Sequence, residues 1–167
     1  AVLRYDVAPG STVELINRSE NSTFLLTDAA DGERSILRVH RPGYHRLQQI
    51  ESELDWLSAL QRDEVVAVPE VLPARDGRRV VSMAEDRHVV RFAFEPGEHP
   101  DEDALTPNDF RGLGRITAHL HQHVGKWRKP LTFDRFAWDW ESSLGDRPRW
   151  GRWQNTAGVG AEERGQS

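Results

Sequence analysis

The chain has 167 residues, of which 37% are hydrophobic and 29% charged, enough for one compact globular domain or slightly more. The formal net charge of −5 argues against a nucleic-acid partner, and the absence of cysteine excludes disulfides, thiol catalysis and cysteine-ligated zinc. No apolar stretch reaches membrane-spanning length and no signal peptide opens the sequence, so we expect a cytoplasmic protein with no membrane partner.

Three β-prone runs, at residues 13–18, 23–27 and 35–40, are joined by turn residues and predict an antiparallel meander. The loop between the first two runs is polar, and backbone amides in a tight turn can bind phosphate oxygens. Because this loop contains no glycine, an ordinary hairpin turn is the simpler interpretation of the loop taken alone. The loop consists of Ser19, Glu20, Asn21 and Ser22.

Arg38 stands in the third run between two apolar residues, where a half-buried charge needs a partner. A helix is predicted at residues 45–61, because apolar residues recur there at spacings of three and four. At about 100° per residue, Glu53 lies at the edge of the apolar face, so it either pairs with Arg38 or is one surface acid among several. A paired guanidinium could bind phosphate oxygens bidentately, although a structural Arg–Glu pair without a ligand is equally consistent with the residues.

Two further runs, at residues 68–72 and 79–83, flank an Asp-Gly turn and predict a hairpin, and a last strand follows at 88–94. Together these elements predict a small α+β lobe with an antiparallel sheet of about five strands plus one helix. The segment after the last strand could hold an adenine against its backbone, with Ala93 and Glu95 supplying carbonyl and amide groups.

A linker is expected at residues 99–105, followed by a helix that begins at Pro107. Thr106 is suited to cap this helix and Asp109 to reach back to the cap. A further helix is predicted at residues 133–144, where apolar side chains fall on one side.

Two sets of side chains each have a functional and a structural interpretation. Of His119, His121 and His123, only the first and last share a helix side, so a metal site would need further ligands and a histidine-rich flank without metal is favoured. Four tryptophans could line a pocket for an apolar or cationic substrate, although packing is their more common role. These are Trp138, Trp140, Trp150 and Trp153.

A specific order of motifs is found in Asn-Arg-Ser-Glu-Asn-Ser-Thr-Phe (17–24), Ile-Leu-Arg-Val-His-Arg-Pro (36–42), Ser-Glu-Leu-Asp-Trp-Leu (52–57), Phe-Glu-Pro-Gly (94–97) and Leu-Gly-Arg-Ile-Thr-Ala-His-Leu-His (113–121). In this order the chain resembles the aminoglycoside phosphotransferase/choline kinase-like superfamily over most of residues 5–140. The resemblance implies a protein-kinase-like fold, ATP and Mg²⁺ as cofactors, and phosphate transfer to a hydroxyl of a small molecule. It places residues 19–22 at the phosphate loop, Arg38 where the family commonly has a lysine, Glu53 as the helix partner and residues 93–95 at the hinge.

The chain departs from this family in its last part. The family's catalytic loop has a His-Gly-Asp-like start with an Asn five residues after the Asp, and a later Asp holds Mg²⁺. Nothing after Trp140 matches, since Asp146 is followed by Arg-Pro-Arg-Trp-Gly and by no further Asp. We therefore assign no catalytic and no metal-ligating residue in this chain, and expect the Mg²⁺ ligands in a missing part and no phosphate transfer by the chain alone.

The expected organisation is a nucleotide-binding kinase-like lobe at residues 1–98, a linker and helices of a truncated large lobe at 99–144, and a flexible tail at 145–167. A nucleotide and a small-molecule hydroxyl acceptor are the expected partners, and the acceptor is left open among aminoglycosides, choline, homoserine and other alcohols. The rival interpretation is a non-catalytic binding or interaction module that self-associates through its uncovered large-lobe face. A metal-binding protein built on the histidine helix is a third alternative.

Overall fold

The structure is a computed structural model that describes residues 1–97 and 101–157. The chain divides into two compact units, Ala1–Phe133 and Asp134–Ser167, which are considered separately below. The first residues of the expected linker and the last ten of the expected tail lie outside the described residues. Within the described part, no helix combines the length and the apolar character needed to cross a membrane.

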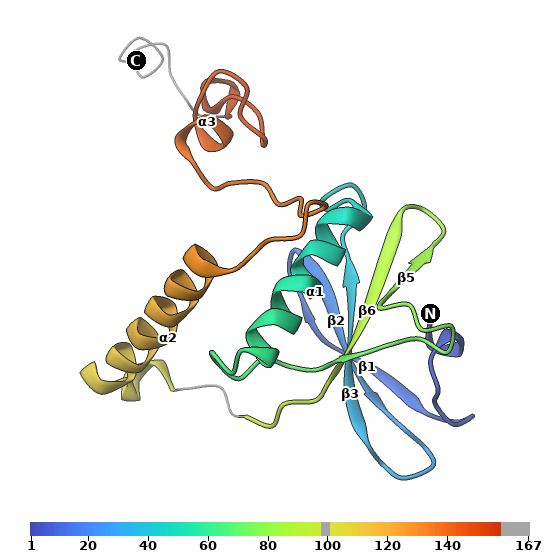
Figure 1. Ribbon diagram of the computed structural model, residues 1–167. Helices are drawn as coiled ribbons and strands as arrows, with labels where there is room; N and C mark the ends of the chain where they lie inside the picture. Colours follow the sequence, from blue (N-terminus) through green and yellow to red (C-terminus); the bar gives the residue numbers. More distant parts are fainter. Residues whose placement is uncertain (98–100, 158–167) are drawn as a thin grey trace. The chain divides into compact units, whose positions relative to one another are not determined.

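The first unit is built on a six-stranded antiparallel sheet with the order β1-β2-β3-β6-β4, in which β5 also pairs with β6 (Figure 1). The strands are β1 (Thr12–Arg18), β2 (Asn21–Thr27), β3 (Arg34–His40), β4 (Val71–Leu72), β5 (Val80–Met83) and β6 (Arg87–Ala93). The predicted meander of the first three strands is present. Short 3-10 turns occur at Val2–Arg4, Glu102–Ala104 and Trp153–Asn155.

The predicted hairpin between residues 68–72 and 79–83 is wrong. Among the described strands, β4 and β5 each pair with β6, β5 along Arg87–Val90 and β4 along Arg91–Phe92. The Asp-Gly turn between them does form, with the amide of Gly77 donating to the carbonyl of Ala74 at 2.9 Å. Both short strands pair with β6 because this seven-residue strand offers one edge long enough for the two of them. The six strands of the sheet correspond to the six β-prone runs of the sequence.

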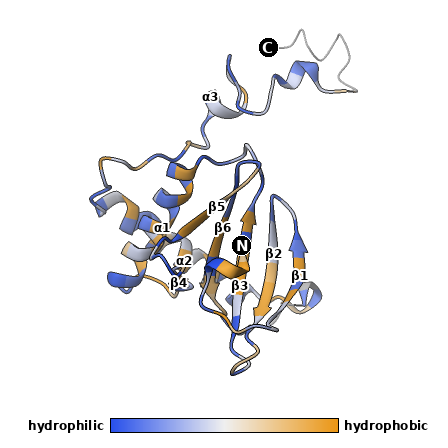
Figure 2. Ribbon diagram, turned by 90° about the vertical axis from the view of Figure 1, so that its right-hand side faces the viewer, coloured by the Kyte–Doolittle hydropathy of each residue, from blue (hydrophilic) through white to orange (hydrophobic). Residues whose placement is uncertain are grey.

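Hydrophobic residues occur along the strands of the sheet (Figure 2), and their buried side chains form two clusters. One face packs on the chain before β1, where Tyr5 is fully buried and its hydroxyl donates to the carbonyl of Val89 at 3.3 Å. The other face packs under the helix α1 (Leu47–Arg62) through a second buried cluster. That cluster contains Ile50, Leu54, Val80, Val90 and Phe92.

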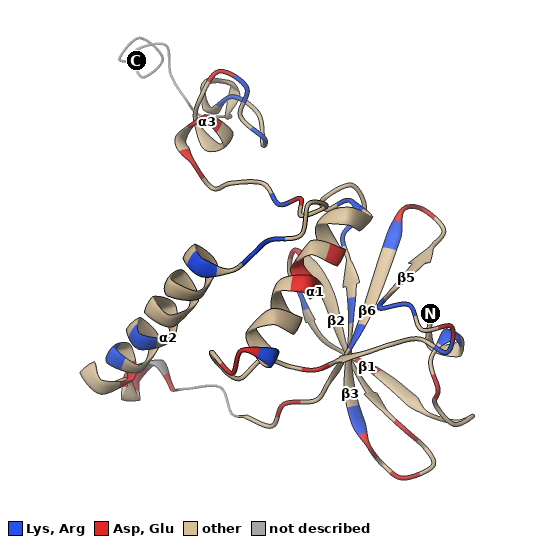
Figure 3. Cartoon of the chain, viewed as in Figure 1, with Lys and Arg blue, Asp and Glu red and all other residues tan. Residues whose placement is uncertain are grey.

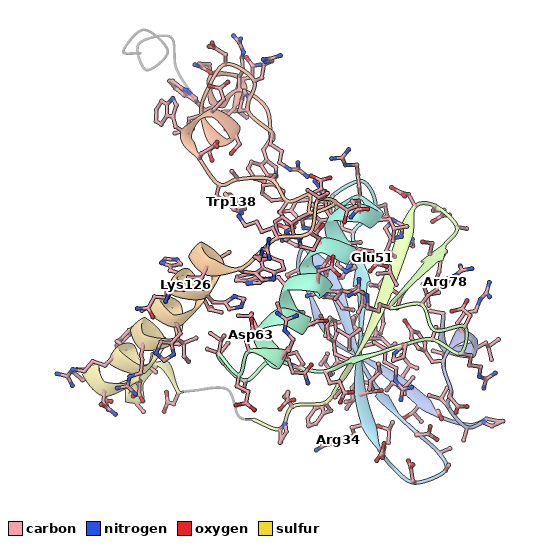
Figure 4. All side chains as sticks on the ribbon, in the orientation of Figure 1. Arg34, Glu51, Asp63, Arg78, Lys126 and Trp138 are labelled. Atoms are coloured by element: carbon pink, nitrogen blue, oxygen red, sulfur yellow. The ribbon has the colours of Figure 1, made fainter. Side chains whose placement is uncertain are left out.

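Helix α1 corresponds closely to the helix predicted at residues 45–61. It is attached to the sheet by the guanidinium of Arg79, which lies 2.6 Å from the carboxylate of Glu51 and 2.8 Å from that of Asp55. Figure 3 shows the acidic residues along α1, and Glu51 is labelled in Figure 4. Glu51 and Asp55 lie on the side of the helix away from Glu53. Two of the acids of α1 therefore bind Arg79, whereas Glu53 lies on another side of the helix.

Helix α2 (Pro107–Lys126) begins where the sequence predicts it. The carboxylate of Asp109 accepts hydrogen bonds from the backbone amide and the hydroxyl of Thr106, at 2.8 and 2.7 Å. Its apolar side chains Phe110, Leu113 and Ile116 are 61%, 59% and 47% exposed. The first half of α2 therefore presents an uncovered apolar face.

The described residues of the second unit include one short α-helix, α3 (Trp140–Ser143), which starts at an N-cap formed by Asp139. The carboxylate of Asp139 accepts a hydrogen bond from the amide of Ser142 at 2.8 Å. The predicted helix at 133–144 is therefore wrong for residues 133–139. Asp139 accounts for the late start, because a side chain that caps the first turn favours a helix beginning after it.

Candidate functional site

A cavity of about 530 Å³ lies against the α1 face of the sheet and is called the large cavity below. Its walls are mainly apolar and come from β1, β2, β3, β6, α1 and the segment that follows β6. Its charged residues are Arg38 and Glu53, which form an ion pair, and Glu95. The lining residues are Ile16, Thr23, Ile36, Arg38, Glu53, Leu57, Pro69, Phe92, Ala93, Phe94 and Glu95.

The register of the strands explains why these residues share one face. Ile36 pairs with Phe92, and two residues further along β3 Arg38 pairs with Val90. Since side chains alternate across a strand, Ile36 and Arg38 point to the same side as α1. The pairing of β1 with β2 is irregular between Leu15 and Asn17, so Ile16 is the extra residue of a β-bulge. A bulge changes the direction of a side chain, and Ile16 lines the cavity.

The predicted pair of Arg38 and Glu53 is present. The Nη2 atom of Arg38 lies 2.5 Å from Oε1 of Glu53, and the two side chains are 24% and 22% exposed. The guanidinium carbon of Arg38 also lies 4.9 Å from the centre of the Phe92 ring. Arg38 is therefore held in one orientation at the wall of the large cavity by a carboxylate and an aromatic ring.

The segment after β6 reaches the same cavity. The amide of Ala93 donates to the carbonyl of Glu70 at 2.8 Å, so this amide is already engaged within the lobe. The ring of Phe94 is held by Arg34, labelled in Figure 4, whose guanidinium carbon is 3.9 Å from the ring centre. Both Ala93 and Glu95, chosen from the sequence, line the large cavity.

The loop between β1 and β2 is shorter than predicted. Only Ser19 and Glu20 lie between the strands, and the amide of Ser19 donates to the carbonyl of Asn21 at 3.0 Å. Asn21 and Ser22 are the first residues of β2, because the antiparallel register continues to the pair of Arg18 and Ser22. The polar segment is thus a two-residue turn followed by strand residues.

The four polar residues 19–22 line a second cavity, of about 200 Å³, called the small cavity below. Three guanidinium groups contribute to its lining, and Glu20 is its one acid, lying 3.2 Å from Arg41 in an ion pair. Its lining residues are Arg18, Ser19, Glu20, Asn21, Ser22, Val39, His40, Arg41 and Arg87. The structure thus groups the sequence-selected residues into two sets: Arg38, Glu53, Ala93 and Glu95 line the large cavity, and residues 19–22 line the small cavity.

His40 is a site residue that the sequence reasoning did not single out. It is the last residue of β3, is only 2% exposed and lines the small cavity. Burial, and after it the charge of Arg38, lowers the pKa of His40 to about 4. The signal was available in the sequence, since His40 stands two residues after Arg38 and therefore on the same face of the strand.

The histidines of α2 do not assemble a metal site in the described part of the chain, where no three His, Cys, Asp or Glu side chains could hold a metal ion. Nδ1 of His123 accepts a hydrogen bond from Nε1 of Trp56 at 3.3 Å, which leaves its Nε2 to donate to Asp63 at 3.0 Å. His123 therefore connects α2 to the end of α1, where Asp63 is labelled in Figure 4.

The four tryptophans of the second unit do not line one pocket. The rings of Trp138 and Trp150 stack at 4.7 Å, whereas Trp140 and Trp153 line a cavity of about 550 Å³ together with Asp146. Ring stacking therefore accounts for Trp138 and Trp150, and the pocket interpretation applies only to Trp140 and Trp153.

Comparison with known proteins identifies the class. The profile of the phosphotransferase enzyme family (APH) matches residues 12–162, and the chain belongs to this family. A solved structure, described as the structure of the microcompartment-associated aminopropanol kinase, is similar with a TM-score of 0.83 and 54% sequence identity. The match covers 98% of this chain and 50% of the kinase chain, so the present chain spans about half the length of that relative. A search of curated proteins finds no match.

The fold is accordingly that of a kinase-like small lobe, an antiparallel sheet with one helix, and α2 and α3 follow it in the chain. The resemblance seen in the sequence is confirmed at the level of family and fold.

Proposed function

We propose that this chain is the ATP-binding part of a phosphotransferase that phosphorylates a hydroxyl of a small molecule. The observation that carries the proposal is the Arg38–Glu53 pair at the wall of the large cavity, beside the segment that follows β6. A guanidinium fixed at the wall of a mainly apolar cleft suits a ligand with an apolar ring and an anionic tail.

The adenine would lie between the apolar side chains of the large cavity, with Ile36 and Phe92 on the sheet side. The amide of Ala93 is engaged by Glu70, so the backbone contacts proposed for the base are the carbonyl of Ala93 and the amide of Glu95. This arrangement uses the two residues that the sequence assigned to the hinge.

Arg38 would bind the α/β-phosphate oxygens while Glu53 keeps its guanidinium in place. ATP supplies the transferred phosphoryl group, and Mg²⁺ neutralises phosphate charge during such transfers. The family's Asp and Asn residues for the base and the metal have no counterpart among residues 141–167 of this sequence. The chain is therefore proposed to bind the nucleotide, and transfer is proposed to need residues that this sequence lacks.

For the acceptor we propose a small amino alcohol. The relative with 54% identity over nearly the whole of this chain is described as an aminopropanol kinase, which supports this class over larger acceptors such as aminoglycosides. The proposal concerns the complete enzyme, because this chain spans about half of that relative.

The proposal is tested by thermal unfolding of the chain with and without ATP and Mg²⁺. A ligand at about 100 times its Kd stabilises the folded state by about 2.7 kcal/mol, so a clear rise in Tm is expected. Arg38→Ala should remove most of this rise. Arg79→Ala is the matched control, because Arg79 is another carboxylate-paired arginine that is not part of the large cavity. An equal rise in Tm for the wild-type chain and Arg38→Ala would contradict the proposal.

A non-catalytic interaction module is the second candidate, and the exposed apolar face of α2 favours it. Phe110, Leu113 and Ile116 are all about half exposed or more, and a contiguous apolar face of this kind promotes association. Size-exclusion chromatography with and without ATP separates the two candidates. A dimer whose stability is indifferent to nucleotide would support the interaction module against the nucleotide-binding lobe.

A further inference from the structure

His40 is buried with unused hydrogen-bonding capacity. Neither of its ring nitrogens has a hydrogen-bond partner among the described residues, although both atoms are removed from solvent. A buried polar group left without a partner costs folding free energy, so such a group in a native protein calls for an explanation.

The same region holds two more polar atoms in this condition. Oδ1 of Asn21 and Nε of Arg38 are also buried without a partner within the described chain. Asn21 is directly opposite His40 in the pairing of β2 with β3, and Arg38 precedes His40 by two residues on the same strand face. Unsatisfied groups are thus concentrated at one place on the ligand-facing side of the sheet.

The position of His40 along β3 matches the order of groups in a nucleotide. Ser35 pairs with Ala93, so the adenine end of the proposed site is at the start of β3. Arg38 follows at the proposed α/β-phosphates, and His40 lies about 7 Å beyond Arg38, since a strand rises about 3.3 Å per residue. A group bound beyond the α/β-phosphates would reach His40.

The charge around His40 suits an anion. The small cavity that it lines contains three guanidinium groups, those of Arg18, Arg41 and Arg87, and one acid, Glu20, which pairs with Arg41; Arg87 pairs with Glu85. Positive charge therefore exceeds negative charge in the lining of the small cavity. The charged or titratable groups that act on His40 are Arg38 on β3, Glu53 on α1, His45 before α1 and His88 on β6. The low pKa of His40 shows that the imidazole is neutral at pH 7, a state that offers one N–H donor and one acceptor.

We propose that His40 is a nucleotide-positioning residue that hydrogen-bonds the terminal phosphate of ATP and thereby makes the site prefer ATP to ADP. This inference rests on the proposed function, because it requires that the nucleotide lie with its adenine at residues 93–95. Oδ1 of Asn21 is an acceptor, so it is not assigned to the phosphate. The donors that the triphosphate would engage are Nε–H of Arg38 and one ring N–H of His40.

The test measures the Kd values of ATP and ADP by calorimetry, at equal Mg²⁺, for the 167-residue chain and its variants. His40→Leu should weaken ATP binding about ten-fold and change ADP binding less than about two-fold, as expected for loss of one hydrogen bond to a charged group. His40→Gln, which keeps a donor, should retain part of the preference. His40→Leu should also leave the Tm unchanged or raise it, because it removes an unsatisfied buried group.

His88→Leu is the matched control. His88 is buried on the same side of the sheet but bonds to Ser82 at 3.1 Å and lies 3.4 Å from Asp86, so its replacement should lower the Tm and leave the ATP/ADP ratio unchanged. An unchanged ATP/ADP ratio in both His40 variants, or an equal loss of both nucleotides, would overturn the role of His40 alone. A wild-type chain that bound neither nucleotide would overturn the proposed function and this inference together.

Discussion

The Arg38–Glu53 pair can be tested by a double-mutant cycle of Arg38→Ala and Glu53→Ala. The two side chains are 24% and 22% exposed, with 2.5 Å between Nη2 and Oε1. Fully exposed pairs contribute about 0.2–1 kcal/mol, whereas breaking a fully buried pair costs about 3–5 kcal/mol. A partly buried pair should lie between these limits, so we expect a coupling free energy of about 1–2 kcal/mol.

The cycle needs urea unfolding curves for the wild-type chain, both single variants and the double variant. ATP affinity measured on the same four proteins should show a larger loss for Arg38→Ala than for Glu53→Ala, because Arg38 is proposed to touch the phosphates and Glu53 to act through it. A coupling below about 0.3 kcal/mol would mean that the residues contribute independently, and the ion pair would then not be what holds Arg38. Equal ATP affinities in all four proteins would refute the role given to the pair.

Four further results are expected. Burial and the neighbouring guanidinium of Arg38 lower the pKa of His40 from 6.5 to about 4 in the folded chain. On acidification His40 therefore gains a proton in the unfolded chain before it does so in the folded chain. The free energy of unfolding should consequently fall by up to about 3 kcal/mol between pH 7 and 4. His40→Leu should flatten this part of the profile in urea titrations. Burial raises the pKa of Tyr5 to about 12, so stability should be lost as the pH rises from about 10 to 12, and Tyr5→Phe should abolish that loss. His123→Ala should lower the free energy of unfolding by about 1–2 kcal/mol, since two hydrogen bonds between α2 and α1 are removed; an unchanged urea midpoint would count against this bridge. Any self-association seen by size-exclusion chromatography should disappear in the double variant Phe110→Ser, Leu113→Ser, and its persistence would exclude the α2 face as the interface.

Local patterns predicted the elements that carry the proposed site. The alternation in β3 and the helical period of α1 made the Arg38–Glu53 pair one of two open interpretations, because these patterns fix which side a residue occupies but not how α1 packs on the sheet. The start of α2 was predictable for a similar reason, since the Thr106–Asp109 capping contact is local in sequence.

The pairing of β4 and β5 was not predictable from the same kind of signal. A turn between two strand-like runs favours a hairpin. In the structure, however, β4 and β5 each pair with β6, and these contacts join residues that are distant in sequence. The helix prediction for residues 133–139 was wrong for a different reason. The helical spacing of the aromatic residues there carries no information about the N-cap at Asp139. The position of His40 two residues after Arg38 indicates its strand face, but the sequence does not show its burial or its lack of hydrogen-bond partners, and His40 was therefore missed.

Nucleotide binding in the large cavity, with the phosphates at Arg38, can be tested by mapping backbone amide chemical shifts on addition of a non-hydrolysable ATP analogue. The largest changes are expected at residues 93–95 and around Arg38, extending to the turn between β1 and β2, with little change in the second half of α2. Changes concentrated in α2 or in the second unit, with the large cavity unaffected, would contradict it.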